Sequence, residues 1–346
     1  MVRNAANQPL PGATVTFTVT GGTGSITGGT AVTDGAGIAT VGSWALGPGA
    51  NCLGAMVAGV GVSGNPVSFA ATGIPAGGAG YDVEVQYLTC VTAAQEAAFA
   101  SAAARWAAII TGDLADLTVT VGAGACGSNS PALASRPIDG PGQILGSAGW
   151  CFIRTAGLLP IIGRMRFDIA DIANLEASGR LTPVILHEMG HVLGIGTSWS
   201  LFGFLQSPSP VGGPPLDTHH NGANAIVGFN AVGGSTYAGG NKVPVENMFG
   251  SGTINAHWRE SVLATELMTG FLGGGGSNPL SELTVRSLLD FGYVVDVSAA
   301  DPFFLTLSLR GEGGGPPEVL IRLENDILIG PRYEIDANGR IRRIRD

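Results

Sequence analysis

One short segment of the sequence carries residues that can hold a metal ion and activate water. It reads His187-Glu188-Met-Gly-His191 and lies within the stretch from Thr182 to Gly194. Residues four apart lie on the same face of a helix, so both imidazoles can reach one metal ion. The carboxylate beside the first histidine can then take a proton from the hydrolytic water. The pattern predicts a catalytic zinc site.

The same pattern can arise by chance on an amphipathic helix, with the histidines packed at its polar edge. Here the neighbouring residues are apolar, at 184–186 and again at 192–193. Three polar side chains without partners would be costly to bury in such surroundings, and a metal supplies the partner. Thr182 can cap the helix, Pro183 suits its first turn and Gly194 can end it. We therefore favour a zinc-binding helix.

A third protein ligand is needed, because catalytic zinc usually has three and keeps its fourth position open. The short form of the motif would place a histidine at position 197, where Thr197 stands. The remaining histidines are His219, His220 and His257. His219 and His220 lie in a Pro/Gly-flanked loop, where solvated side chains are common. A carboxylate could ligate instead, and the candidates are Glu246, Glu260 and Glu266.

His257 is favoured because His257-Trp is followed by Glu266-Leu-Met268-Thr-Gly270, a candidate Met-turn. Here the chain from about Tyr81 to Asp296 resembles leishmanolysin-like metalloproteases of the metzincin clan. In them, His-Glu-x-x-His-x-x-Gly is separated by a long insertion from a His-Trp ligand and a Met-turn. The matching residues are His187, Glu188, His191, Gly194, His257 and Met268. The resemblance implies Zn²⁺ as cofactor, Met268 as the floor beneath it, and a protein or peptide substrate. Without it, Met268 would pass for an ordinary core residue.

Three functions are compatible with this site. In a zinc metalloendopeptidase, Glu188 takes the proton of the attacking water and later gives it to the leaving amine. The alternative is a non-catalytic cell-surface adhesion protein with a structural or degenerate zinc site, which would not need that glutamate. The third is a metal hydrolase of a non-peptide amide. For an extended peptide substrate, the strand expected at 163–167 is our candidate for pairing through the backbone.

The elements expected around the site alternate between strands and helices, which indicates an α+β domain. A strand is expected at 81–88, followed by a helix that opens with a capping box at Thr92 and Gln95. The later elements are strands at 117–121 and 163–167, a short helix at 172–178, and a closing helix at 279–292 with Leu283, Leu288 and Phe291 inward.

The first 72 residues alternate β-branched runs with Gly-rich turns, which is typical of an antiparallel sandwich. The segments 8–19 and 33–41 resemble bacterial immunoglobulin-like domains of the invasin and intimin type. We therefore predict a multidomain chain with an all-β sandwich at 1–72 and a Gly/Pro linker at 73–80. The α+β metzincin-type domain follows at 81–296, and 297–346 form a C-terminal β extension to which we assign no role.

Composition excludes several partners. The formal net charge of −9 and the lack of a basic cluster, apart from the tail Arg340–Arg345, argue against nucleic acid as a ligand. No run approaches the ~18 apolar residues that a transmembrane helix needs. The oligomeric state leaves no signature in the sequence.

The cysteines favour an exported protein. Cys52, Cys90, Cys126 and Cys151 lack the close spacing of a structural zinc site, so we expect disulfides, with Cys126–Cys151 as the preferred pair. Buried reduced thiols are the alternative. The chain opens without a signal peptide, so we expect an N-terminally truncated sequence of a secreted or cell-surface protein.

Overall fold

The computed structural model describes the chain in segments that form two compact units. The described residues are 1–59, 63–73, 80–115, 117, 126, 140–142, 144–273, 278–305, 321–323, 325–328 and 330–344. One unit comprises Met1–Gly77 and Glu84–Ala97, and the other comprises Gly78–Val83 and Ala98–Asp346.

The first unit is built from antiparallel strands. Its larger sheet has the order β3-β1-β5-β6, and β2 pairs with β4. The strands are β1 (Thr14–Gly21), β2 (Ser25–Thr27), β3 (Thr30–Val32), β4 (Ser43–Ala45), β5 (Gly49–Val57) and β6 (Val67–Gly73). Val15 and Phe17 alternate with exposed threonines and bury against Leu53, as a period of two requires. A Cys52–Cys90 disulfide closes this unit.

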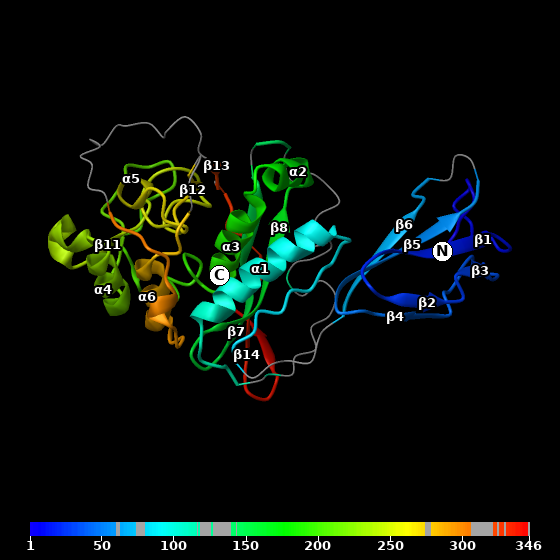
Figure 1. Cartoon of the computed structure of the whole chain (residues 1–346), viewed down its shortest axis with the longest axis horizontal. Coiled ribbons are helices and arrows are strands. Elements are labelled where there is room, and N and C mark those ends of the chain that lie inside the picture. Colours follow the sequence, from blue (N-terminus) through cyan, green and yellow to red (C-terminus); the bar gives the residue numbers. More distant parts are fainter. Residues whose placement is uncertain are drawn as a thin grey trace. The chain divides into compact units, whose positions relative to one another are not determined.

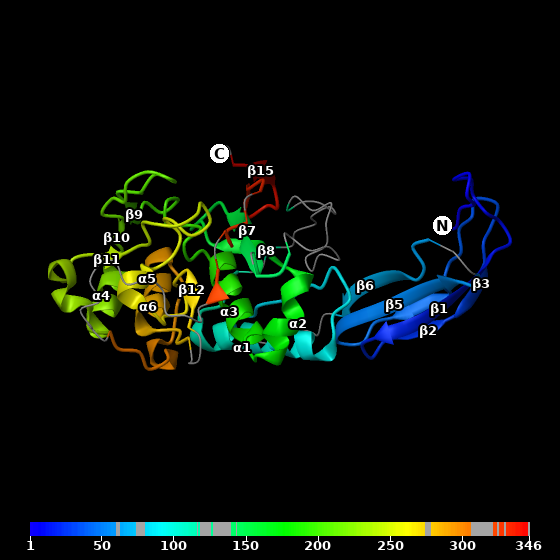
Figure 2. The same ribbon diagram turned by 90° about the horizontal axis from the view of Figure 1, so that it is seen from above.

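The second unit places a mixed sheet beside helices (Figures 1 and 2). The sheet has the order β15-β14-β7-β8, in which β7 is antiparallel to β8 and parallel to β14. Its strands are β7 (Gly146–Arg154), β8 (Pro160–Phe167), β14 (Tyr333–Ile335) and β15 (Ile341–Arg343). The helices near it are α1 (Ala93–Ile109), which begins in the first unit, α2 (Ile169–Ala177) and α3 (Leu181–Val192).

The rest of the second unit consists of short elements around two packed helices. In both views α4 (Ala223–Ala231) lies beside α6 (Glu282–Phe291) (Figures 1 and 2). The other elements are α5 (Glu260–Leu263), β9 (Leu205–Gln206), β10 (His219–His220), β11 (Val243–Pro244), β12 (Phe271–Leu272), β13 (Ile321–Arg322), and the 3-10 helices η1 (Gly234–Gly240) and η2 (Val297–Ala299). Helices and several small sheets are thus mixed in this unit. Among the described residues, no helix has both the length and the apolarity to cross a membrane.

Several elements predicted from the sequence are confirmed. Thr92 and Gln95 form the capping box, each side chain bonding the backbone N–H of the other, at 3.2 and 3.0 Å. The strand at 163–167 is part of β8, and the helix predicted at 172–178 is α2. The closing helix is α6, which ends at Gly292 with a φ of 103°. Leu283, Leu288 and Phe291 are buried.

Two local predictions are wrong. Residues 81–88 form no strand, because Tyr87 N–H bonds the Thr72 side chain rather than a strand partner. Thr182 does not cap α3, which begins one residue earlier with Arg180 at the cap. Pro183 still lies in the first turn, where its missing N–H costs nothing. Of the strand predicted at 117–121, residues 118–121 lie outside the described part of the chain.

The described residues after position 296 belong to the second unit. β13 pairs with β12, and β14 pairs with β7. The segment between β13 and β14 also bridges to Ala148 of β7 through Ile327. These contacts bring the C-terminal region into the same packed unit as α3.

The expected Cys126–Cys151 disulfide is confirmed. It links two cysteines of the second unit that are 25 positions apart in the sequence. We expect Cys126→Ser with Cys151→Ser to lower the free energy of unfolding of this unit by about 2–4 kcal/mol, because the unfolded chain regains freedom. Urea denaturation followed by tryptophan fluorescence tests this. The double change Cys52→Ser and Cys90→Ser removes the disulfide of the other unit and should leave the unfolding transition of the second unit unchanged. An equal shift of that transition would contradict a specific role of Cys126–Cys151 in the second unit.

Candidate metal centre

Three histidines from distant parts of the sequence meet in the second unit. His187 and His191 lie one turn apart on α3, and His257 comes from the loop before α5. Their Nε2 atoms are 2.9 Å apart for His187 and His191, 3.1 Å for His191 and His257, and 3.2 Å for His187 and His257. All three side chains are fully buried. The structure therefore brings together the three residues that the sequence selected.

The opposite nitrogen of each ring is anchored to the backbone. The Nδ1 atoms of His187, His191 and His257 bond the carbonyl oxygens of Leu267, Ile195 and Thr253, at 2.7, 2.9 and 3.1 Å respectively. A carbonyl oxygen only accepts, so each Nδ1 carries a proton, and each ring in its neutral form turns an Nε2 lone pair inward. Burial lowers the pKa of His187 to about 4, which keeps that ring neutral at ordinary pH.

The three inward nitrogens fit a metal ion. Neutral Nε2 atoms have no proton to share among themselves, and leaving buried acceptors unsatisfied costs about 1–3 kcal/mol each. A cation at their common centre satisfies all three at once. Imidazole nitrogens are preferred ligands of zinc, and ring anchoring through Nδ1 is usual at such sites. His187, His191 and His257 are therefore suited to hold zinc.

Asp326 is a fourth group at this centre, and the sequence analysis missed it. Its Oδ2 atom lies 3.1 Å from His187 Nε2, 3.0 Å from His257 Nε2 and 3.5 Å from His191 Nε2. The four residues form one buried cluster of possible metal ligands. Burial alone would raise the pKa of Asp326, but the neighbouring histidines hold it well below its usual range. The surrounding sequence, Leu323-Glu-Asn-Asp-Ile-Leu328, has no metal-ligand spacing and carries no information about the distance to the histidines.

Glu188 is buried beside this cluster with both carboxylate oxygens unpaired among the described residues. Burial, and then the charge of Asp326, raises its pKa well above the usual value. Gly146, the first residue of β7, gives it room, since a Cβ there would be 2.9 Å from Glu188 Oε1. β7 therefore approaches Glu188 at its first residue. The expectation that residues 163–167 of β8 hold the substrate stays a prediction.

Met268 packs against α3 at Gly190, between the two helix histidines. A Cβ on Gly190 would be 2.7 Å from the Met268 sulfur, so a larger residue there would require the Met268 side chain to shift. Glu266 holds the turn by accepting hydrogen bonds from the backbone of Met268 and the hydroxyl groups of Ser281 and Thr284. The side chain of Met268 is fully buried.

The turn after α3 brings the chain back to His257. Gly194 follows the helix with a φ of 112°, and Thr197 donates to the carbonyl of His191 at 2.6 Å. Gly196 has a φ of 73°, and a Cβ there would be only 1.9 Å from the carbonyl oxygen of Ala256. This close approach fixes the residue next to His257.

The other candidate ligands lie outside the cluster. His220 packs against aromatic rings and accepts from Gly222 N–H at 3.1 Å. Burial, followed by the charge of His219, lowers its pKa to about 3. His219 contacts the carbonyl of Asp217. The remaining candidates are Glu246, which accepts from backbone N–H groups at 247, 248 and 260, together with Glu260 and Glu266.

A comparison of two glycines with the same φ distinguishes the cost of backbone strain from the cost of losing the close approach to Ala256. Gly196 and Gly203 both have a φ of 73°, but a Cβ on Gly203 would meet nothing within 4 Å. Gly203→Ala should cost about 1–2 kcal/mol from left-handed strain. Gly196→Ala should cost about 3 kcal/mol or more and reduce bound zinc, because Ala256 must move. Thermal unfolding and metal analysis check this; equal effects of the two changes would contradict it.

Comparison with known proteins covers the same region. A family model described as leishmanolysin matches residues 132–307, just over half of the 346-residue chain. The match includes α3, His257 and Met268 and ends before Asp326. No curated protein matches the chain. This family consists of zinc metallopeptidases that act on proteins or peptides. The chain, with its buried cluster of metal-ligating side chains, belongs to the leishmanolysin family.

Proposed function

We propose that the second unit is a zinc-dependent endopeptidase in which His187, His191 and His257 hold the metal and Glu188 is the catalytic base. The observation that carries the proposal is the inward convergence of three Nε2 atoms, within 3.2 Å of one another, beside an unpaired carboxylate. Three neutral nitrogens and a free carboxylate are the parts that hydrolytic zinc sites require.

Glu188 moves the protons of the reaction. Zinc in this site would supply Lewis acidity, polarising the scissile carbonyl and making an attacking water easier to deprotonate. Glu188 accepts the proton from that water and then delivers it to the nitrogen of the leaving amine. Its position next to His187 in the chain keeps it close to the ligands, and burial strengthens it as a base by raising its pKa.

The first half of β7 is the proposed binding edge for the substrate. Gly146 lies against Glu188, and the backbone of the following residues can pair with an extended peptide. Pairing through the backbone holds a peptide irrespective of its side chains. Cleavage within protein chains follows from such a site, which makes casein or gelatin suitable substrates for assay.

One observation favours the alternative of a non-catalytic protein with a structural zinc site. Asp326 adds a fourth protein group to the cluster, and structural zinc sites fill all four positions. A structural site leaves no purpose for the buried, unpaired Glu188.

The remaining features fit an exported protease. We propose that residues 1–72 form an immunoglobulin-like spacer, followed by a linker at 73–80 and the catalytic domain from 81. Both disulfides, Cys52–Cys90 and Cys126–Cys151, suit an oxidising compartment. Leishmanolysin-family proteins are typically extracellular or at the cell surface, and we propose the same location here.

The role of Glu188 can be separated from metal binding. Glu188→Gln should keep full zinc and reduce casein cleavage by about 10²- to 10⁴-fold, because the amide cannot accept the proton. Metal analysis and a proteolysis assay on the same preparation measure both. Glu176→Gln on α2 serves as the matched control and should leave both unchanged. Full cleavage by Glu188→Gln would exclude the proposed base.

The third ligand can be identified by removing one histidine at a time. His257→Ala should lose most of the zinc and all measurable cleavage, since two imidazoles hold zinc poorly. His219→Ala removes a histidine outside the cluster and should retain both. Zinc content after dialysis against a weak chelator is the measurement. Unchanged zinc in His257→Ala would mean that the metal is held elsewhere.

A further inference from the structure

The C-terminal segment 321–328, described at residues 321–323 and 325–328, runs across the candidate metal centre. On one side β13 pairs with β12, and Leu323 N–H bonds the carbonyl of Gly270, two residues after Met268. On the other side the segment bonds Ala148 of β7. Between these attachments lies Asp326, whose Oδ2 faces all three Nε2 atoms. The segment thus connects the Met-turn side of the site to β7.

Asp326 fills the direction that a catalytic zinc would keep open. Its Oδ2 is 3.0 to 3.5 Å from the three nitrogens, so the four donor atoms surround one point. Its other oxygen has no hydrogen-bond partner among the described residues, although the side chain is only 1% exposed. A carboxylate aimed in this way is a fitting zinc ligand and a competitor of water.

The backbone of the segment also uses the edge proposed for the substrate. Ala148 N–H donates to the carbonyl of Asp326 at 2.6 Å, and the carbonyl of Ala148 accepts from Leu328 N–H at 2.8 Å. A built Cβ on Gly149 would be 3.3 Å from the carbonyl oxygen of Leu328. A peptide cannot pair with this part of β7 while residues 326–328 occupy it.

We propose that residues 321–328 are a built-in inhibitor of the peptidase, with Asp326 occupying the water position at the metal and its backbone occupying the substrate edge. This inference rests on the proposed function, because it regulates that same site. The protein is then latent as it stands, and displacement of the segment exposes the metal, Glu188 and β7 together. The occupant is a segment of this chain, so inhibition does not depend on concentration.

The segment is held by few contacts, so it can be displaced. β13 has only two residues, Asn325 is exposed with a φ of 61°, and Ile327 and Leu328 are partly exposed. The chain is held more firmly downstream, where β14 pairs with β7, Phe152 stacks on Tyr333 at 4.9 Å and Arg332 lies over Trp150. The segment can therefore leave the site while the region beyond it stays anchored.

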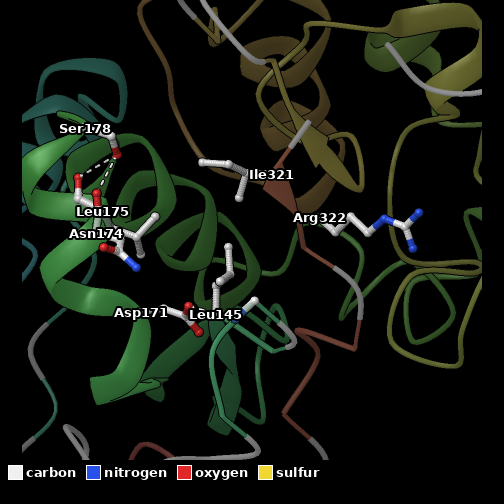
Figure 3. Close-up of a pocket in the computed structure, with 8 residues that line it drawn as sticks. Leu145, Asp171, Asn174, Leu175, Ser178, Ile321 and Arg322 are labelled. Atoms are coloured by element: carbon white, nitrogen blue, oxygen red, sulfur yellow. Dashed lines mark hydrogen bonds between the residues drawn. The ribbon is translucent and has the colours of Figure 1, made fainter. Parts of the chain in front are cut away.

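A pocket borders the segment on the side of α2. It has a volume of about 400 Å³, and Ile321 and Arg322 line it together with Leu145, Asp171, Asn174 and Leu175 (Figure 3). Leu145 precedes Gly146, which lies against Glu188. The start of the segment therefore lines a hollow on this side and is not enclosed there by packed side chains.

Asp326 also lies outside the part of the chain that the family match covers, which ends at residue 307. The three histidines and Glu188 are all inside the matched range.

The test compares the native chain with Asp326→Ala, with Asn325→Ala and with the control Asp336→Ala. Asn325→Ala keeps the carboxylate but removes the hydrogen bond from Gly252 N–H to Asn325 Oδ1 and puts alanine at a positive φ. Asp336 caps the turn between β14 and β15, so its replacement removes a carboxylate from the same region but not from the site. Each protein is measured for zinc content and casein cleavage. Each is also loaded with Co²⁺ and titrated with acetohydroxamate, whose binding at the metal changes the visible absorption.

Asp326→Ala should keep one equivalent of zinc and bind acetohydroxamate more tightly than the native chain. If the segment is closed in about nine of ten molecules of the native chain, casein cleavage by Asp326→Ala rises about tenfold. Asn325→Ala should show a smaller rise in both, and Asp336→Ala should match the native chain.

Two results overturn the inference. In one, Asp326→Ala keeps zinc but matches the native chain in acetohydroxamate binding and cleavage. In the other, Asp326→Ala folds but loses its zinc, which would make Asp326 a structural ligand. If Asp326→Ala does not fold, the test rests on Asn325→Ala, and unchanged acetohydroxamate binding in that variant overturns the inference. Failure of the proposed function is distinct, because acetohydroxamate would then reach the metal in Asp326→Ala while no variant cleaved any protein.

Discussion

The second unit depends on three buried imidazole rings that are each fixed by one nitrogen so that the other faces a common point. Three Nδ1–H groups bond backbone carbonyls of the Met-turn, of the turn after α3 and of the loop before His257. The inward Nε2 atoms then lack any partner that carries a proton, and such a core is costly without a cation. We therefore expect metal binding and folding of this region to be coupled, since the candidate ligands meet only in the folded chain.

Close approach of backbone segments makes this arrangement possible. Gly190 lets Met268 lie under α3, Gly196 lets the carbonyl of Ala256 approach, and Gly146 leaves room for Glu188. A side chain at Gly196 would push the backbone of Ala256 away, whereas at Gly190 and Gly146 it would displace the side chains of Met268 and Glu188. The glycines of this chain thus do more than form turns: at these positions they set the spacing between the elements that carry the ligands.

The C-terminal segment adds a fourth protein group to the candidate metal centre. Three histidines alone describe an open site, whereas the carboxylate of Asp326 closes it. A closed site is either structural or latent, and the unpaired Glu188 beside it fits latency, because only hydrolysis requires a base there. The same backbone groups of Ala148 that hold residues 326–328 would be needed by a peptide. The same short segment, residues 326–328, therefore occupies both the candidate metal centre and the proposed binding edge.

The sequence alone determined the parts of the site that lie within one helix or one short motif. The spacing of His187, Glu188 and His191 placed them on one stretch of α3, and the His-Trp and Met-turn motifs selected His257 and Met268. The capping box at Thr92 and the end of α6 at Gly292 also follow from local rules, because each depends on backbone bonds within a few residues. By contrast, the strand expected at 81–88 failed, since alternation of apolar residues does not supply a partner strand. Tertiary structure alone decided that Asp326, 135 positions beyond His191 in the numbering, joins the histidines. Its distance from them is set by the pairing of β14 with β7 and of β13 with β12, and no local pattern encodes such long-range pairing.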